Sequence, residues 1–323
     1  MLTIGEIQEI VSKKLEKESF ISEPASLYEP IDYIMSIGGK RLRPMLVIIA
    51  AQLYGKPVES VIDAAVGVEV FHNFTLVHDD IMDQAPIRRG KKTVHKAWDI
   101  NTAILSGDTM MVLAYDHLLR SHSKNIVQIL NTFNQTAREV CEGQQYDMDF
   151  EKRSDVSIGE YMEMIRLKTS VLMAAALKIG ALYADAPEED LENLYRFGEK
   201  IGLAFQLKDD LLDVFGDESK FGKQTGNDII TNKKTYLLVR CLADASQSDR
   251  AALESWLKVN DRPQEKINEV TKLYRKYNIP EKTNLLIEEL YSEGVHYLGK
   301  VTVEVALKKP LHDFAEALRL RDS

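Results

Sequence analysis

Apolar residues recur at helical spacing over long stretches of this chain. Three stripes show the pattern most clearly, and they run through residues 61–75, 195–209 and 285–298. Steps of three and four residues place these side chains on one face of an α-helix. Alternating apolar and polar runs are scarce, and the chain contains no Asn-Gly or Asp-Gly pair that would favour a tight hairpin. The pattern therefore predicts helices almost throughout.

Glycine and proline divide the helical pattern into segments of roughly 15–30 residues, which is long for globular helices. The breaks fall at residues 38–39, 55–57, 86–92, 186–187, 216–232, 261–263, 279–280 and 309–310. No low-complexity linker separates one part of the chain from another. We predict an all-α fold with one domain over residues 1–323, built as a single large bundle of long helices.

The composition is that of an ordinary globular protein, with 45% apolar and 28% charged residues in 323. A net charge of −9 argues against a general nucleic-acid partner. Cys141 and Cys241 are far apart, which favours two thiols in a reducing compartment. The first residues do not resemble a signal peptide. The longest apolar stretch, 170–183, is too short to span a membrane and contains Lys178. We expect a soluble cytoplasmic protein without a transmembrane segment.

Two acidic groups share the pattern D-D-x-x-D, and each follows an apolar helical stripe. The first is Asp79, Asp80 and Asp83, and the second is Asp209, Asp210 and Asp213. Carboxylates four residues apart repel each other on one helix face. The helix dipole also disfavours them at a carboxyl end. One such group could be a solvated acidic face, but two copies favour binding of divalent cations. Brought together, they would bind several hard cations and, through them, a polyanion.

Basic residues occur in three groups, two of which follow the acidic groups along the chain. A glycine turn leads into Lys40, Arg41 and Arg43; residues 88–92 contain Arg88 and Arg89 after the first acidic group; and Lys223, Lys233 and Lys234 follow the second. Any one of these could be an ordinary surface charge. Together, acid followed by base after each helix is typical of a metal–diphosphate site, in which Arg and Lys bind phosphate oxygens.

A rival pattern involves the histidines. Residues 69–72 and 293–296 both read E-x-x-H, and two such motifs on facing helices are half of a di-iron carboxylate site. Gly294 weakens the second copy as a helix, and this interpretation leaves both acidic groups unexplained. Lys168 and Thr169 interrupt an apolar window at 164–182, where a lysine needs an anion or access to water. Gln206 precedes Asp209 by about one turn and is expected to face the same side.

In these motifs the chain resembles the trans-isoprenyl diphosphate synthases of the polyprenyl synthetase family. The matching segments are GGKRLRP at 38–44, HDDIMD at 78–83, RRGKKTVH at 88–95, GD at 107–108, LKT at 167–169, FQLKDDLLDVFGD at 205–217, and GKQTGNDI with NKKT at 222–235. Their order and spacing agree with the family from about residue 25 to 240. Beyond residue 240 the resemblance is weak. The resemblance implies helices around a deep central cavity, a homodimer, and condensation of isopentenyl diphosphate with an allylic diphosphate.

The resemblance also implies residue roles. Asp79, Asp83 and Asp209 would bind Mg²⁺, about three ions with Mn²⁺ as an alternative, and Asp80, Asp210 and Asp213 complete the predicted metal set. The remaining contacts fall into three groups: Arg88, Lys168, Lys223 and Lys233 toward the allylic diphosphate; Lys40, Arg43, His72 and Arg89 toward isopentenyl diphosphate; Thr169 and Gln206 along the reacting carbons.

Product length is expected to depend on residues before the first acidic group. Phe71 and Phe74 could form a floor beneath the growing chain, although ordinary core packing would also explain them. Farnesyl-type members with the short first motif often carry bulky aromatics at both preceding positions, whereas this chain has Phe74 and the smaller Thr75. We predict a C20 product, with C15 next. A longer-chain synthase and a class I terpene cyclase are the alternatives.

Overall fold

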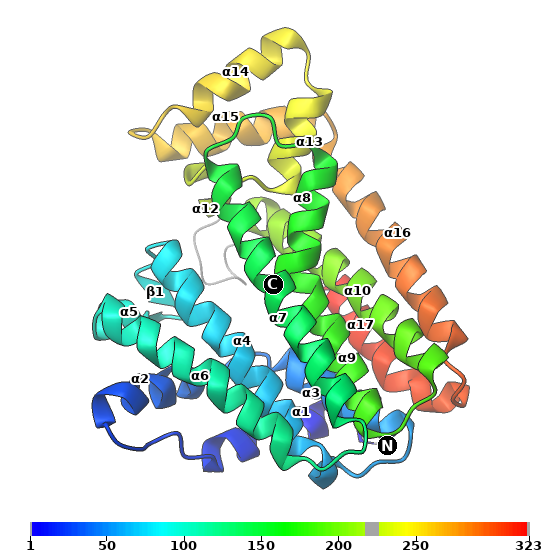
Figure 1. Ribbon diagram of the computed structural model, residues 1–323. Coiled ribbons are helices and arrows are strands. Elements are labelled where there is room, and N and C mark those ends of the chain that lie inside the picture. The colour runs from blue at the N-terminus through cyan, green and yellow to red at the C-terminus, as the bar shows by residue number, and fades with distance from the viewer. Residues whose placement is uncertain (1, 217–225, 322–323) are drawn as a thin grey trace. The chain divides into compact units, whose positions relative to one another are not determined.

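The computed structural model describes residues 2–216 and 226–321, and these residues confirm the all-α prediction (Figure 1). The N-terminal part contains α1 (Ile4–Lys17), α2 (Ala25–Ser36), α3 (Leu42–Leu53), η1 (Val58–Ser60), α4 (Ile62–Met82), α5 (Val94–Ala97) and α6 (Ile100–Arg120). The middle contains α7 (Ile126–Glu151), α8 (Ile158–Ile165), the π-helix η2 (Arg166–Ser170), α9 (Val171–Tyr183) and α10 (Glu188–Phe215). The C-terminal part contains α12 (Asn227–Ile230), α13 (Tyr236–Asp244), α14 (Gln247–Leu257), α15 (Pro263–Lys276), α16 (Ile279–Lys300), η3 (Val305–Lys308) and α17 (Lys309–Arg319).

The three apolar stripes lie in long helices, as predicted. The stripe at 61–75 belongs to α4, the stripe at 195–209 to α10 and the stripe at 285–298 to α16. Both acidic groups lie at the carboxyl ends of their helices, because α4 ends at Met82 and α10 at Phe215. Among the described residues, no helix is both long and apolar enough to cross a membrane.

The chain divides into two compact units that interleave along the sequence. The first comprises Met1–Phe133, Ala175–Glu192 and Thr302–Pro310, and the second Asn134–Ala174, Asn193–Val301 and Leu311–Ser323. Helices α7, α9 and α10 each carry residues of both units. The single-domain organisation therefore stays a prediction.

In the first unit, α4 packs along α6 and against α3 (Figure 1). Nearly every residue of α3 is buried, as is most of the first half of α4. Gly67 permits the close approach of α4 to α6, because a Cβ there would lie 2.8 Å from the carbonyl oxygen of Ala114. This packing fixes the axis of α4 and so the place of the first acidic group.

In the second unit, two apolar clusters support α10. One is formed by residues of α7, α8, α10, α13 and α16, including Phe150, Tyr161 and Leu207. The other joins the end of α10 to α12–α16, with Leu211 and Tyr274 buried in it. Because Leu207 and Leu211 are buried in these clusters, the opposite side of the same turns carries Asp209 and Asp213.

The described residues contain one short β-ladder, which the sequence pattern did not predict. Strands β1 (Ile87–Arg88) and β2 (Lys91–Lys92) pair antiparallel. The turn between them has positive φ at Arg89 (50°) and Gly90 (75°). Two central residues with positive φ match the hairpin turn that Asn-Gly usually supplies. Here Arg-Gly takes its place, so the usual sequence signal was missing.

Candidate active site

The first acidic group separates into one buried carboxylate and two that are more accessible. Asp79 is half-buried and Asp83, the C-cap of α4, is exposed. Asp80 is only 1% exposed and accepts hydrogen bonds from Arg88 Nε at 2.9 Å on both carboxylate oxygens. Burial raises the pKa of Asp80, and the Arg88 guanidinium opposes that rise. Arg88 therefore ties the β1–β2 hairpin to the end of α4.

The second acidic group is arranged in the same way. Asp209 is half-buried and accepts a hydrogen bond from Arg321 at 2.5 Å. Asp210 is buried and accepts from the hydroxyl of Tyr161, from Gln206 Nε2 at 3.0 Å and from the amide of Tyr236 at 3.3 Å.

Electrostatics reinforce this separation within the second group. Burial raises the pKa of Asp210 to about 7, and the neighbouring charge of Asp228 adds to the rise. Asp213 accepts a hydrogen bond from the backbone amide of Asp228 at 2.9 Å, which ties α12 to the end of α10. In each group the second carboxylate is thus buried and hydrogen-bonded within its own unit, whereas the first is only half-buried.

Three of the four residues predicted to bind isopentenyl diphosphate are adjacent in the first unit. Arg43 Nη1 lies 3.1 Å from His72 Nε2, and Arg89 donates a hydrogen bond to the carbonyl of Gly38. Lys40 is exposed on the same loop, between Gly39 and α3. Gly39 allows Arg89 to approach, since a Cβ at that position would lie 2.6 Å from Arg89 Nη1.

This cluster is strongly cationic. Burial lowers the pKa of His72 well below its usual range, and the charges of Arg43, Arg89, Arg88 and Arg41 lower it further. The imidazole is therefore neutral at neutral pH, and the surrounding guanidiniums carry the charge. Such a group favours an anion with several oxygens.

The predicted residues Lys168, Thr169 and Gln206 are brought together in the second unit by the π-helix η2. Lys168 Nζ pairs with Asp147 at 2.6 Å. Thr169 donates to Gln206 Oε1 at 3.1 Å, and Gln206 in turn donates to Asp210. A continuous line of hydrogen bonds thus runs from η2 to the buried carboxylate of the second acidic group.

Two glycines permit the position of η2. A Cβ at Gly143 on α7 would lie 2.3 Å from the backbone nitrogen of Lys168, and one at Gly202 on α10 would lie 2.7 Å from Ser170 Cα. Single π turns inside α-helices are frequent at functional sites. Backbone contact on two sides therefore fixes where Lys168 and Thr169 lie.

The structure describes Lys233 but not Lys223, the two remaining basic residues predicted to contact the allylic diphosphate. Lys233 lies close enough to Asp210 and Asp228 for its positive charge to lower the pKa of both carboxyl groups. Lys223 falls outside the described residues.

Two of the three residues expected to set product length, Phe71 and Phe74, belong to a line of aromatic rings in the first unit. Phe71 is fully buried, and its ring centroid lies 5.6 Å from that of Phe74 and 5.0 Å from that of Phe133. The Phe74 ring also contacts His78 at 4.8 Å. Thr75 donates its hydroxyl to the carbonyl of His72 at 2.7 Å, one turn earlier on α4.

Several partners in these networks were not predicted from the sequence. Asp147 is one acid in the polar run at 142–149, and nothing in the helical pattern distinguished it. Tyr161 is indistinguishable from a core aromatic. Asp228 did carry a signal, because it belongs to the GKQTGNDI segment that had been recognised.

The di-iron alternative finds no support in the first unit. Glu69 forms a buried ion pair with Arg41 at 2.6 Å, and His72 contacts Arg43. Because Glu69 and His72 each have an arginine neighbour, binding of an iron ion by these two side chains is disfavoured. In the other motif, Glu293 pairs with Lys200 at 2.5 Å.

The carboxylates of the acidic groups would suit a metal ion that takes its remaining ligands from water and from the phosphate oxygens of a substrate. Within residues 2–216 and 226–321, no cluster of three or more His, Cys, Asp or Glu side chains is placed to hold a metal ion. Mg²⁺ usually takes one or two carboxylates, with waters and phosphate oxygens as its other ligands. Asp79 and Asp83, one turn apart, fit that arrangement.

Comparison with known proteins decides the family. The polyprenyl synthetase family model matches residues 24–276. The chain belongs to the polyprenyl synthetase family. It is 43% identical over 231 residues to a geranylgeranyl diphosphate synthase of Methanosarcina mazei, with 71% of each chain covered. It is 40% identical over 253 residues to a geranylfarnesyl diphosphate synthase of Natronomonas pharaonis, which covers 72% of this chain and 74% of that one.

Solved structures agree with this family assignment. A crystal structure of a geranylgeranyl pyrophosphate synthase superposes with a TM-score of 0.95 at 42% identity, covering 100% of both chains. The family resemblance and the all-α fold predicted from the sequence are therefore confirmed.

Proposed function

We propose that this protein is a prenyltransferase that condenses isopentenyl diphosphate with an allylic diphosphate, head to tail, to give a trans-polyprenyl diphosphate and diphosphate. One observation in the first unit carries the proposal. Helix α4 presents His72, within a cationic cluster, and then Asp79 at the start of the acidic group. Seven residues of helix separate them by about 10 Å. One helix thus offers a metal-type and a cationic diphosphate site, as a two-diphosphate reaction requires.

The cationic cluster is the proposed site of isopentenyl diphosphate. Arg43 and Arg89 supply charged donors, and Lys40 adds a third from the exposed loop. Neutral His72 can donate one further hydrogen bond without adding charge. This set holds the second substrate while its double bond attacks the allylic carbon.

The acidic groups are the proposed site of the allylic diphosphate. Asp79, Asp83 and Asp209 are the proposed ligands of Mg²⁺, with about three ions expected and Mn²⁺ as an alternative. When bound, the metal ions stabilise negative charge on the leaving diphosphate. Lys168, Lys223 and Lys233 are proposed to contribute cationic charge to the same group, and Arg88 to hold the end of α4 beside it.

The predicted metal role of Asp80, Asp210 and Asp213 stays a prediction. Asp80 and Asp210 are buried and already accept hydrogen bonds from their own units. Their surroundings favour a positioning role, in which each holds the more accessible carboxylates of its helix in place.

Thr169 and Gln206 are proposed to face the reacting carbons. Polar oxygens near an allylic cation stabilise its charge, while the apolar walls exclude water that would quench it. The proton lost after condensation is proposed to pass to the released diphosphate.

We assign a C20 product as the principal one. The backbone of Phe74 lies about 7.5 Å before that of Asp79 along the helix axis. Its contacts with Phe71 and His78 hold it in place, which supports a floor at that depth.

A homodimer is the proposed assembly. Leu105, Val112 and Leu119 are each at least 50% exposed on α6. They are seven residues apart and so share one helix face. A stripe of large exposed apolar side chains is uncommon on a monomer and is typical of an interface. The cytoplasmic location stays a prediction.

Substitution of Asp79 tests the metal assignment. Asp79→Ala removes one proposed ligand, so turnover at saturating Mg²⁺ should fall by about 10²–10³-fold or more. Asp261→Ala, which removes an exposed carboxylate between α14 and α15, is the matched control and should leave turnover unchanged. Near-normal turnover of Asp79→Ala would contradict the assignment.

A further inference from the structure

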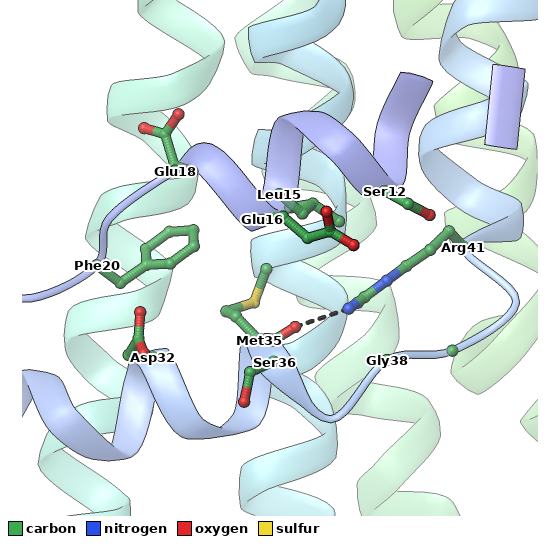
Figure 2. A pocket seen from close by; sticks show the side chains of 11 residues that line it. Ser12, Leu15, Glu16, Glu18, Phe20, Asp32, Met35, Ser36, Gly38 and Arg41 are labelled. Atoms are coloured by element: carbon green, nitrogen blue, oxygen red, sulfur yellow. Dashed lines mark hydrogen bonds between the residues drawn. The ribbon is translucent and has the colours of Figure 1, made fainter. Parts of the chain in front are cut away.

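The loop that carries Lys40 and Arg43 is undercut by a cavity. This space of about 340 Å³ lies between α1, α2 and the loop, and its lining includes Leu15, Phe20, Met35, Gly38, Gly39 and Arg41 (Figure 2). The loop has positive φ at Gly38 (83°), Gly39 (148°) and Arg41 (50°). A segment with such backbone angles over a cavity gains little support from packing below it.

Arg41 spans this gap and holds the loop. Its Nη2 donates to the carbonyl of Met35 at 2.7 Å, the contact drawn in Figure 2, and its Nη1 donates to Glu69 Oε1 at 2.6 Å. Arg41 is only 7% exposed and Glu69 only 2%. Both Nη atoms of the guanidinium thus donate to protein groups, so this side chain is engaged within the protein.

Glu69 connects the loop to α4, the helix that carries His72. It lies three residues before His72 on α4. Asn73, fully buried, donates to the Glu69 carbonyl at 2.8 Å and to its Oε1 at 3.2 Å, which fixes the carboxylate. The carboxylate also opposes the effect of burial on the pKa of Arg89. Glu69 therefore neutralises part of the charge at the centre of a crowded cationic cluster.

From these contacts we propose that the buried Arg41–Glu69 pair is a positioning device for the isopentenyl diphosphate site. It sets the place of Lys40 and Arg43 relative to His72 and Arg89 without touching the substrate. The proposal rests on the proposed function.

A purely structural role predicts a different outcome, which makes the proposal testable. Buried ion pairs can often be replaced by apolar side chains of similar volume without loss of stability. If the pair only fills space, Arg41→Met with Glu69→Leu should leave kinetics unchanged. If the pair positions the loop, the same variant should fold and yet bind isopentenyl diphosphate poorly.

Steady-state kinetics with each substrate varied in turn is the first test. Arg41→Ala should raise KM for isopentenyl diphosphate about 10–100-fold, since displacement of binding groups by about 1 Å has effects of that size. KM for the allylic diphosphate should change by less than about threefold. Arg240→Met, which removes a partly buried guanidinium paired with Asp244 on α13, is the matched control and should change neither KM.

Chemical rescue is the second test. Truncation of Arg41 opens its site to the cavity, so millimolar methylguanidinium should lower KM for isopentenyl diphosphate in Arg41→Ala and leave the parent enzyme unchanged. Unchanged KM in a folded variant, an equal rise for both substrates, or a rise that methylguanidinium does not reduce would each overturn the proposal.

A variant that fails to fold and a failure of the proposed function can each be recognised. If Arg41→Ala does not fold, the Arg41→Met and Glu69→Leu double variant decides: a raised KM for isopentenyl diphosphate supports the proposal, and an unchanged KM overturns it. Failure of the proposed function would appear differently, because the unsubstituted protein would then form no product with any primer.

Discussion

Gly143 offers the most direct way to move the π-helix η2 without removing any functional group. Gly143→Ala adds one methyl group on α7, which would lie 2.3 Å from the backbone nitrogen of Lys168 and 2.8 Å from its Cα. These are backbone atoms, so no flexible side chain can yield. To restore an ordinary contact of about 3.4 Å, η2 must recede by about 1 Å.

The expected effects on stability and on catalysis differ in size. Overpacking of this kind costs about 1–3 kcal/mol. The better helix propensity of alanine returns up to about 1 kcal/mol. The melting temperature should therefore fall by no more than a few degrees. Displacement of Lys168 and Thr169 by about 1 Å should lower kcat by about 100-fold.

The assay is turnover of isopentenyl diphosphate with an allylic primer, alongside thermal unfolding. Gly159→Ala is the matched control, because a Cβ at Gly159 meets nothing within 4 Å. It lies near the start of α8 and should keep normal turnover with unchanged or slightly higher stability. Near-normal kcat in Gly143→Ala would refute the reasoning that backbone contact at η2 sets the catalytic geometry.

Two other substitutions probe separate parts of the account. Phe74→Ala should lengthen the product beyond that of the parent enzyme, because it removes a ring of the proposed floor; chromatography of the dephosphorylated products checks this, and an unchanged length would place the floor elsewhere. Burial and the charge of Arg120 lower the pKa of His117 to about 4, against an ordinary value of 6.5. The unfolded chain therefore binds more protons below pH 6.5, and stability should fall as the pH drops toward 4, by up to about 3 kcal/mol. His117→Asn should remove that part of the fall in urea titrations between pH 7 and pH 4.5; an identical slope in both proteins would argue against it.

The fold was largely predictable because its signals are periodic. Long apolar stripes predicted α4, α10 and α16, and the acidic groups were correctly placed at helix ends. The β1–β2 hairpin escaped prediction because Arg-Gly, rather than Asn-Gly, adopts its turn. That turn matters, since it brings Arg88 to Asp80.

The site was predictable in its residue types more than in its connections. The sequence pointed to Arg43, His72 and Arg89 together. The structure brings Arg43 into contact with His72 and places Arg89 near enough for its charge to lower the pKa of His72. It gave no means of separating Asp80 from Asp79, because adjacent residues on a helix differ only in which face the tertiary packing covers. The pairing of Arg41 with Glu69 depends on a contact across 28 residues of sequence, which periodicity does not encode.

The central claim is tested most directly by product analysis of the purified protein. The measurement is incubation with labelled isopentenyl diphosphate, Mg²⁺ and each allylic primer in turn, followed by determination of product length. We predict a trans product that is principally C20 and is lost when the metal is chelated. No product with any primer, or product formation that is indifferent to chelation, would contradict it.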